Sequence, residues 1–313
     1  MLKIHFLNVG HGDCIIIENF ETKRNTVIDI NRSKEMDSDS KKEVYESYRG
    51  LASAFADMAI LESGNISTFQ LEAKGYDINL TDPIEYLKQQ NIKNIHRFIS
   101  THPHMDHISG IKALYDEVGF TNVWISNHTW SPDVSKLSAS QKIDWDFYQK
   151  LKKNQIEEVT TIKPLEYDTR DFLASDGFKV LAPNQNILNQ SNSNANHISY
   201  VLLLEYAGRK IVFGGDAEKL TWEHINNTHN TKIEDVTILK ASHHGRDSGY
   251  HQLSVKNMNP DYTIVSVGKK PSTDSSNKYR NYCENVWSTR WKGDIVFTFE
   301  NDGSGIYNFE YVR

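Results

Sequence analysis

Hydrophobic and polar positions alternate in short runs at both ends of the chain. In the first thirty residues, the runs 5–9, 14–18 and 26–30 are rich in β-forming side chains and are separated by glycine-containing or polar segments. Comparable runs cover residues 95–100, 122–126, 178–182, 198–206, 209–213, 236–240, 262–267, 294–300 and 305–312. The pattern therefore predicts strands in both halves of the chain.

Apolar residues at helical spacing lie between these strands. Residues 42–62 carry apolar side chains three and four positions apart, which predicts an amphipathic helix near the mouth of a site or on the flank of the sheets. Asp82, Pro83 and Glu85 have the residue types expected at the N-cap, first and third positions of a helix over residues 83–90.

Two further helices are predicted in the middle of the chain. The first covers residues 108–118, and Gly119 is suited to end it because glycine accepts the backbone conformation of a C-cap. The second covers residues 138–153. We expect three of its apolar side chains to face inward: Ile143, Phe147 and Leu151.

Strands at both ends with helices interspersed predict an α+β protein, an αββα sandwich of two mixed sheets packed face to face with helices outside. Neither a solenoid repeat nor a Pro- or Gly-rich linker divides the sequence. We therefore expect one domain over residues 1–313, with insertions at 33–76 and 130–160.

Composition and charge exclude several classes of protein. A hydrophobic content of 38% allows a core, and the two cysteines, Cys14 and Cys283, are too few for a disulfide scaffold. The sequence shows no membrane span or signal peptide, so a cytoplasmic protein that does not bind membranes is expected. A net charge of −6 argues against coating nucleic acid, although six bases and two acids lie within residues 269–292.

The segment His102-x-His104-x-Asp106-His107 carries the strongest chemical signal, because three imidazoles and a carboxylate lie within six residues at the end of a strand. Alternation along the extended part puts His102 and His104 on one side. The following helical turn brings Asp106 and His107 together. Imidazole with some carboxylate suits zinc, manganese or iron, so the segment predicts ligands for two adjacent metals.

Two later segments place further candidate ligands after strands. Gly214 and Gly215 precede Asp216, whose two carboxylate oxygens could bridge two cations. His243 and His244 follow the strand predicted at 236–240, and one could complete a metal site while the other contacts substrate.

Taken in order, Asp29, the HxHxDH segment, Asp216 and the late histidine pair resemble the metallo-β-lactamase superfamily. Residues 6–13, 196–199, 214–216, 242–245 and 266–268 narrow the resemblance to the soluble hydrolase domain of ComEC-type competence proteins. Without the family, residues 10–13 are equally well described as a tight turn between two strands.

The resemblance implies two divalent ions, Zn²⁺ or Mn²⁺. His102, His104 and Asp216 would hold the first, and the second would be held by Asp106, His107, Asp216 and one of His243 and His244. Asp29 would orient a ligand histidine rather than bind metal.

Three positions depart from the family pattern. Asn196 stands where many superfamily members have a further histidine, and His197 beside it could bind metal, contact substrate or pair with a carboxylate. Lys278 and Arg280 replace a family His-Pro pair and could meet a phosphate. Asn31 stands where a glycine usually follows the Asp29 motif.

The expected activity is metal-dependent hydrolysis by a hydroxide held between two cations, most simply of a phosphodiester in DNA. Asp106, His197 and His244 are the expected catalytic residues, with His197 or the spare histidine donating a proton to the leaving group. Hydrolysis of a small ester, lactone or phosphorylcholine-type substrate is an alternative, as is a non-catalytic metal-binding sensor. The sequence identifies no protein partner.

Overall fold

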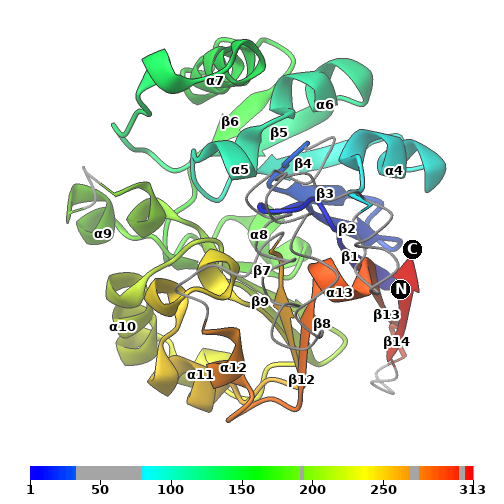
Figure 1. Ribbon diagram of the computed structural model, residues 1–313, viewed down its shortest axis with the longest axis vertical. Coiled ribbons are helices and arrows are strands. Elements are labelled where there is room, and N and C mark those ends of the chain that lie inside the picture. The colour runs from blue at the N-terminus through cyan, green and yellow to red at the C-terminus, as the bar shows by residue number, and fades with distance from the viewer. Residues whose placement is uncertain (33–78, 191–193, 268–274, 303–306, 313) are drawn as a thin grey trace, which may run out of the picture.

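The computed structural model describes residues 1–32, 79–190, 194–267, 275–302 and 307–312. Within them, two mixed sheets form a sandwich, as expected from the sequence (Figure 1). The first has the order β14-β13-β1-β2-β3-β4-β5-β6, and the second has the order β12-β11-β10-β9-β8-β7. The helix predicted at 42–62 lies outside the described residues, and so does the insertion expected at 33–76.

The strands of the first sheet are β1 (Leu2–Phe6), β2 (Ile15–Asn19), β3 (Asn25–Ile28), β4 (Ile95–Ile99), β5 (Phe120–Trp124), β6 (Thr160–Ile162), β13 (Asp294–Phe299) and β14 (Tyr307–Val312). Those of the second are β7 (Phe178–Ala182), β8 (Val201–Tyr206), β9 (Arg209–Phe213), β10 (Ile238–Lys240), β11 (Tyr262–Val265) and β12 (Asn285–Ser288). In each sheet, one part is antiparallel and the other is parallel, running through β3–β6 in the first and β9–β12 in the second.

The described helices are α4 (Pro83–Gln89), α5 (Met105–Ile108), α6 (Ile111–Glu117), α7 (Ala139–Lys152), α8 (Asp171–Ser175), α9 (Gln185–Gln190), α10 (Lys219–Thr228), α11 (Gln252–Met258), α12 (Ser276–Tyr279) and α13 (Thr289–Lys292). Figure 1 shows α6 and α7 on one outer side of the sandwich and α10 and α11 on the other. None of the helices in these ranges is both long and apolar enough to cross a membrane.

Alternation along the strands explains why both faces of each sheet are buried. In β2, Ile15 and Ile17 enter the core between the sheets, whereas Ile16 points to the layer of α4, α6 and α7. In β8, Leu202 lies between the sheets and Leu203 packs toward α10 and α11. The three layers of apolar side chains hold the strand ends in fixed positions.

Several predicted boundaries were wrong by a few residues. The strand expected at 26–30 ends at Ile28 because Asp29 has a positive φ of 57°. The strand expected at 198–206 begins only at Val201, after a 3₁₀ turn at Ala195–Ile198. The strand expected at 122–126 is β5, which starts and ends two residues earlier.

The prediction for α7 was correct in position and wrong for one side chain. Ser138 forms a capping box with Gln141, which explains where the helix begins. Ile143 was expected to face inward but is 57% exposed. The Asp144 carboxylate instead accepts hydrogen bonds from the backbone of α6, and Trp145 and other aromatic side chains of α7 pack beside it. These contacts rotate Ile143 to the solvent edge.

Candidate metal centre

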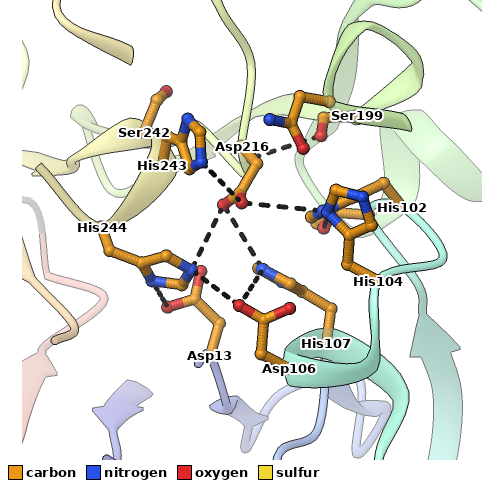
Figure 2. A network of polar contacts seen from close by, with 12 residues as sticks. Asp13, His102, His104, Asp106, His107, Ser199, Asp216, Ser242, His243 and His244 are labelled. Carbon is orange, nitrogen blue, oxygen red and sulfur yellow. Dashed lines mark hydrogen bonds and ion pairs between the residues drawn. The ribbon is translucent and has the colours of Figure 1, made fainter. Parts of the chain in front are cut away.

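The sandwich brings the three motifs together at one edge, where β4, β9 and β10 end. His102 and His104 follow β4, Asp216 follows β9, and His243 and His244 lie in a 3₁₀ turn at Ser242–Gly245 after β10. Figure 2 shows these side chains surrounding the Asp216 carboxylate.

Gly214 explains how the segments after β9 and β10 approach so closely. A Cβ atom at this position would lie 2.1 Å from the Ser242 hydroxyl oxygen, so any other residue would force the two segments apart. The Ser242 hydroxyl donates to the Gly214 carbonyl and accepts from the Trp222 indole, which fixes the turn that carries His243 and His244.

Three imidazoles approach the two oxygens of Asp216. The distances from Asp216 are 3.6 Å to Nε2 of His102, 3.4 Å to Nε2 of His107 and 3.7 Å to Nε2 of His244. Asp106 extends the cluster, because its Oδ2 lies 3.3 Å from Nε2 of His244 and 3.9 Å from Nε2 of His107. The buried Asp216 therefore lies between two groups of candidate ligands.

His104 joins the cluster through His102. Its Nδ1 lies 2.9 Å from Nε2 of His102, and its ring stands edge-on to Trp130 with centroids 5.1 Å apart. In a tetrahedral zinc site, bonds of ~2.0–2.1 Å set ligand atoms roughly 3.3 Å apart. The 3.6 Å between Nε2 of His102 and Oδ2 of Asp216 is close to this value, and His104 lies next to His102, which makes it a candidate ligand for the same ion.

The hydrogen-bond inventory also fits bound metal. Oδ1 of Asp216, Nε2 of His107 and Nε2 of His244 are buried and have no partner at hydrogen-bond geometry among the described residues. Ligand atoms of His102, His107 and Asp216 lie within 4.8 Å of one another, as do those of His11, Asp106 and His244. Imidazole and carboxylate donors of this kind suit zinc, manganese and iron.

Side chains and carbonyls behind the cluster fix the direction of two imidazoles. Nδ1 of His107 donates to Oδ2 of Asp29 at 2.8 Å, and Nδ1 of His244 donates to the Ser266 carbonyl at 2.9 Å. In each ring Nδ1 carries the proton, so the lone pair of Nε2 faces Asp216. Asp29 thus contacts His107 as expected for an orienting residue.

The electrostatics of the cluster favour added positive charge. Burial raises the pKa of Asp216, but the imidazoles of His107, His244 and His102 outweigh it and hold the pKa well below its ordinary value. Burial lowers the pKa of His107, yet the carboxylates of Asp216, Asp29 and Asp106 raise it well above the ordinary value. Without a metal, an added proton on Nε2 of His107 and of His244 would therefore balance the acids here, and a bound cation would take the place of these protons.

His243 approaches the other oxygen of Asp216 from the one that His244 approaches. Its Nε2 lies 3.9 Å from Asp216, while its Nδ1 contacts the Ser248 hydroxyl at 2.7 Å and lies 3.4 Å from Glu218. Hydrogen bonding to His243 lowers the pKa of Glu218 to about 2, in spite of partial burial. His243 thus has partners that His244 lacks.

Asn196 and His197 converge on the same Glu218 carboxylate. The Asn196 amide donates to Oε1 at 3.0 Å, and Nε2 of His197 lies 3.4 Å from Oε2. His197 is therefore near a carboxylate, which was one of three roles left open by the sequence.

Lys278 and Arg280 are engaged with other groups. The Lys278 ammonium pairs with Asp247, and the Arg280 guanidinium donates to the Val286 carbonyl at 3.2 Å. Both side chains are exposed. Their expected role in binding substrate stays a prediction.

Sequence reasoning missed three residues beside the cluster, Glu218, Arg246 and Trp130, and left the roles of His11 and Asp13 open. The Asp13 carboxylate pairs with the ammonium of the buried Lys240 at 2.8 Å. The Glu218 carboxylate accepts a hydrogen bond from the Asn196 amide and lies near Nδ1 of His243. His11 stacks on His244 with ring centroids 4.6 Å apart, and Arg246 contacts His11. Trp130 covers His104. The position of Glu218 and Arg246 two residues after candidate ligands was the available signal.

Comparison with known proteins gives one sequence relative and several structures. No family model matches the chain. ComE operon protein 3 of Bacillus subtilis (strain 168) is 24% identical over 229 residues, which are 73% of this chain and 26% of that protein. The chain therefore spans about a quarter of the length of this relative.

Three solved structures align with most of the chain. Igni18, a metallo hydrolase from Ignicoccus hospitalis KIN4/I, has 13% identity and a TM-score of 0.48, covering 95% of this chain and 100% of its own. A diphosphatase from the PhnP family has 10% identity and a TM-score of 0.44, covering 96% and 99%. A long form RNase Z from yeast has 9% identity and a TM-score of 0.43, covering 94% and 41%.

The fold explains the order of the motifs. The HxHxDH segment comes from the first sheet, and the Gly-Gly-Asp and His-His segments come from neighbouring parallel strands of the second. They meet only because the two sheets pack face to face. With this two-sheet arrangement the chain has the αββα sandwich of the metallo-β-lactamase fold, and the match to ComE operon protein 3 agrees with its resemblance to ComEC-type hydrolase domains.

Proposed function

We propose that this chain is a metal-dependent hydrolase that cleaves phosphodiesters. The observation that carries the proposal is a set of three buried atoms, on Asp216, His107 and His244, that face one another and have no hydrogen-bond partner in the part of the chain that the structure describes. A buried polar atom without a partner costs about 1–3 kcal/mol. Three such atoms at one point are best explained by divalent ions that bind them.

The distances support two groups of ligands joined by Asp216. His102, His104 and Asp216 would hold one ion, with His107 nearby. Asp106, His107, His244 and Asp216 would hold the other. We prefer His244 over His243 for this site because Nε2 of His244 is buried and lies 3.3 Å from Oδ2 of Asp106, whereas His243 is more exposed and its Nε2 lies 3.9 Å from Asp216.

Bound Zn²⁺ or Mn²⁺ would supply Lewis acidity and would lower the pKa of a bound water molecule toward neutrality. The protein contributes the geometry. Asp29 and the Ser266 carbonyl keep the Nε2 lone pairs of His107 and His244 directed at Asp216, and Asp216 holds both groups together through its two oxygens. Ligands held this rigidly need little reorganisation during the reaction.

Glu218 and its two histidines are our candidates for proton transfer to the leaving group. His197 and His243 each lie 3.4 Å from this carboxylate. The ionised Glu218 would stabilise a protonated imidazole, which is the form that can donate a proton. His197 is 24% exposed and therefore open to a leaving group.

A nucleic acid is our preferred substrate within the phosphodiesters. The similarity to ComE operon protein 3 and the ComEC-type motifs support this choice. The net charge of −6 opposes long-range attraction of a polyanion, so binding would depend on local cations.

The decisive experiment measures metal content and cleavage together. The purified protein is loaded with Zn²⁺ or Mn²⁺ and assayed on bis-p-nitrophenyl phosphate, then on DNA, RNA and a lactone. We expect about two ions per chain and metal-dependent cleavage of the phosphodiesters. Two bound ions with no cleavage of any substrate would favour a sensor, and cleavage of the lactone alone would replace the phosphodiesterase proposal.

A further inference from the structure

Arg246 is a cationic side chain beside the candidate centre that has no carboxylate partner within the described residues. It comes two residues after His244 and is only partly exposed. Its Nη2 atom lies 3.3 Å from Nε2 of His11, and its Nε is buried without a partner. Lys240 and Lys278, by contrast, are paired with carboxylates.

His11 holds this guanidinium close to the centre. Since arginine can only donate, Nε2 of His11 is the acceptor and the proton of the ring lies on Nδ1. The His11 ring stacks on His244 with centroids 4.6 Å apart, and Nε2 lies 3.9 Å from Oδ2 of Asp106. His11, Asp106 and His244 could themselves hold a metal, but the contact with Arg246 occupies the Nε2 lone pair of His11.

The turn that carries His11 is fixed by Asn31, one of the departures from the family pattern. The Asn31 amide donates to the carbonyls of His11 at 2.8 Å and Val9 at 3.1 Å. The position of His11, and through it that of Arg246, is therefore set by the fold before any ligand arrives.

A partly buried guanidinium with an unused N–H group favours an anion. Burial weakens the hydration of the charge, and no acid of the described chain replaces it. The oxygens of a phosphoryl group carry negative charge, and two of them can accept hydrogen bonds from two N–H groups of the planar guanidinium. A neutral ester or lactone supplies no such charge before reaction.

We propose that Arg246, oriented by His11, binds a non-bridging oxygen of a phosphoryl group in the substrate. This inference rests on the proposed function and makes it more specific, because it assigns the selection of phosphorus over carbonyl substrates to one side chain. The contact with a phosphate that the sequence predicted for Lys278 and Arg280 is assigned by this proposal to Arg246.

Inorganic phosphate is the probe for the test. Its affinity is measured by calorimetry with metal-loaded and metal-free protein, for wild type, Arg246→Ala and Arg246→Lys. We expect Arg246→Ala to weaken phosphate binding about 10- to 100-fold. Arg246→Lys should recover part of the loss, because it keeps the charge without the fork. Arg170→Ala, which removes a surface arginine paired with Asp168, is the matched control and should change nothing.

Kinetics give the second measurement. Arg246→Ala should raise KM for bis-p-nitrophenyl phosphate by a similar factor and leave cleavage of uncharged p-nitrophenyl acetate within about 2-fold. Unchanged phosphate affinity in Arg246→Ala would overturn the inference. An equal loss of activity on the phosphodiester and on the acetate ester, or a loss of bound metal in this variant, would also overturn it. If wild type bound phosphate through Arg246 but neither bound metal nor cleaved any ester, the inference would stand and the proposed function would fail.

Discussion

At the scale of single residues, Asp29 is a buried carboxylate that contacts the candidate ligand His107 and the segment before it. Its two oxygens accept from Nδ1 of His107, from the backbone N–H of Thr101 at 2.7 Å and from the Thr101 hydroxyl at 2.6 Å. The carboxylate is therefore fully used in holding the segment and the His107 ring.

Replacing Asp29 with Asn should weaken metal binding about 10- to 100-fold, because an amide offers one acceptor oxygen where the carboxylate offers two. Affinity is measured by competition with a chromophoric chelator. Thr101→Ser keeps the hydroxyl that donates to Asp29 and serves as the control. Wild-type affinity in Asp29→Asn would show that His107 does not need this carboxylate.

His104→Ala should remove a ligand without removing a structural contact of the core. His104 is partly exposed, and its side chain forms no capping hydrogen bond at the start of α5. We expect phosphodiesterase activity to fall at least ~100-fold and the Tm of metal-free protein to change by less than ~4 °C. His96→Ala, in the β4 strand that precedes this segment and outside the cluster, should keep activity. A large fall in Tm would point to a structural role for His104 instead.

At the scale of elements, the loop between β1 and β2 packs directly on the segment that carries Asp106. The backbone N–H of Asp13 donates to the Asp106 carbonyl at 3.2 Å. Gly12 has a φ of 149°, and a Cβ atom there would lie 2.5 Å from the same carbonyl and 2.6 Å from the Asn31 amide nitrogen. A glycine is required at this contact between two elements.

Gly12→Ala should therefore displace α5 together with Asp106. We expect a loss of about 2 kcal/mol or more in the free energy of unfolding, with weaker metal binding. Two effects could destabilise Gly12→Ala: backbone strain at a positive φ and the steric contact of the new Cβ atom. Gly208→Ala separates them, since Gly208 also has a positive φ but its Cβ would meet nothing within 4 Å. That control should lose only ~1–2 kcal/mol and keep its metals. Equal behaviour of the two variants in urea unfolding would refute the steric explanation.

At the scale of the whole molecule, Glu166 ties the segment after β6 to the helical layer outside the second sheet. Its carboxylate accepts from Nε2 of His224 at 2.7 Å, from Nε2 of His229 at 2.6 Å and from the Asn184 amide at 2.8 Å. Burial raises the pKa of Glu166, but these three hydrogen bonds outweigh it and lower the pKa below its ordinary value.

A depressed pKa means that the folded state prefers the ionised carboxylate. Its contribution to stability is present above the unfolded pKa of about 4.5 and is lost as the pH falls through the lower, folded value. Glu166→Gln should cost about 2 kcal/mol at pH 7, and the difference from wild type should shrink below pH 4.5. Urea unfolding of metal-free protein between pH 7 and pH 3 measures this. Glu205→Gln, at an exposed surface pair, should show no such trend; a constant difference for Glu166→Gln would contradict the linkage.

Local patterns in the sequence were sufficient for the features that depend on neighbouring residues. Strand alternation predicted two mixed sheets, and Asp82 with Pro83 marked the start of α4, where the Asp82 carboxylate accepts from the N–H groups of Ile84 and Glu85. The candidate ligands were also visible, because glycines, histidines and acids stood at the ends of apolar runs. β6, β12, α10 and α11 were missed, since their patterns are short or mixed.

Only the tertiary structure decided which of the candidate residues meet. His243 and His244 are adjacent in sequence, but both have positive φ, 49° and 53°, and their side chains approach different oxygens of Asp216. In the same way, Lys278 pairs with Asp247, whereas Arg246 reaches His11 from the other end of the chain. The contact between Arg246 and His11 joins residues 235 positions apart, and the packing of the two sheets, which no local pattern specifies, sets such distances.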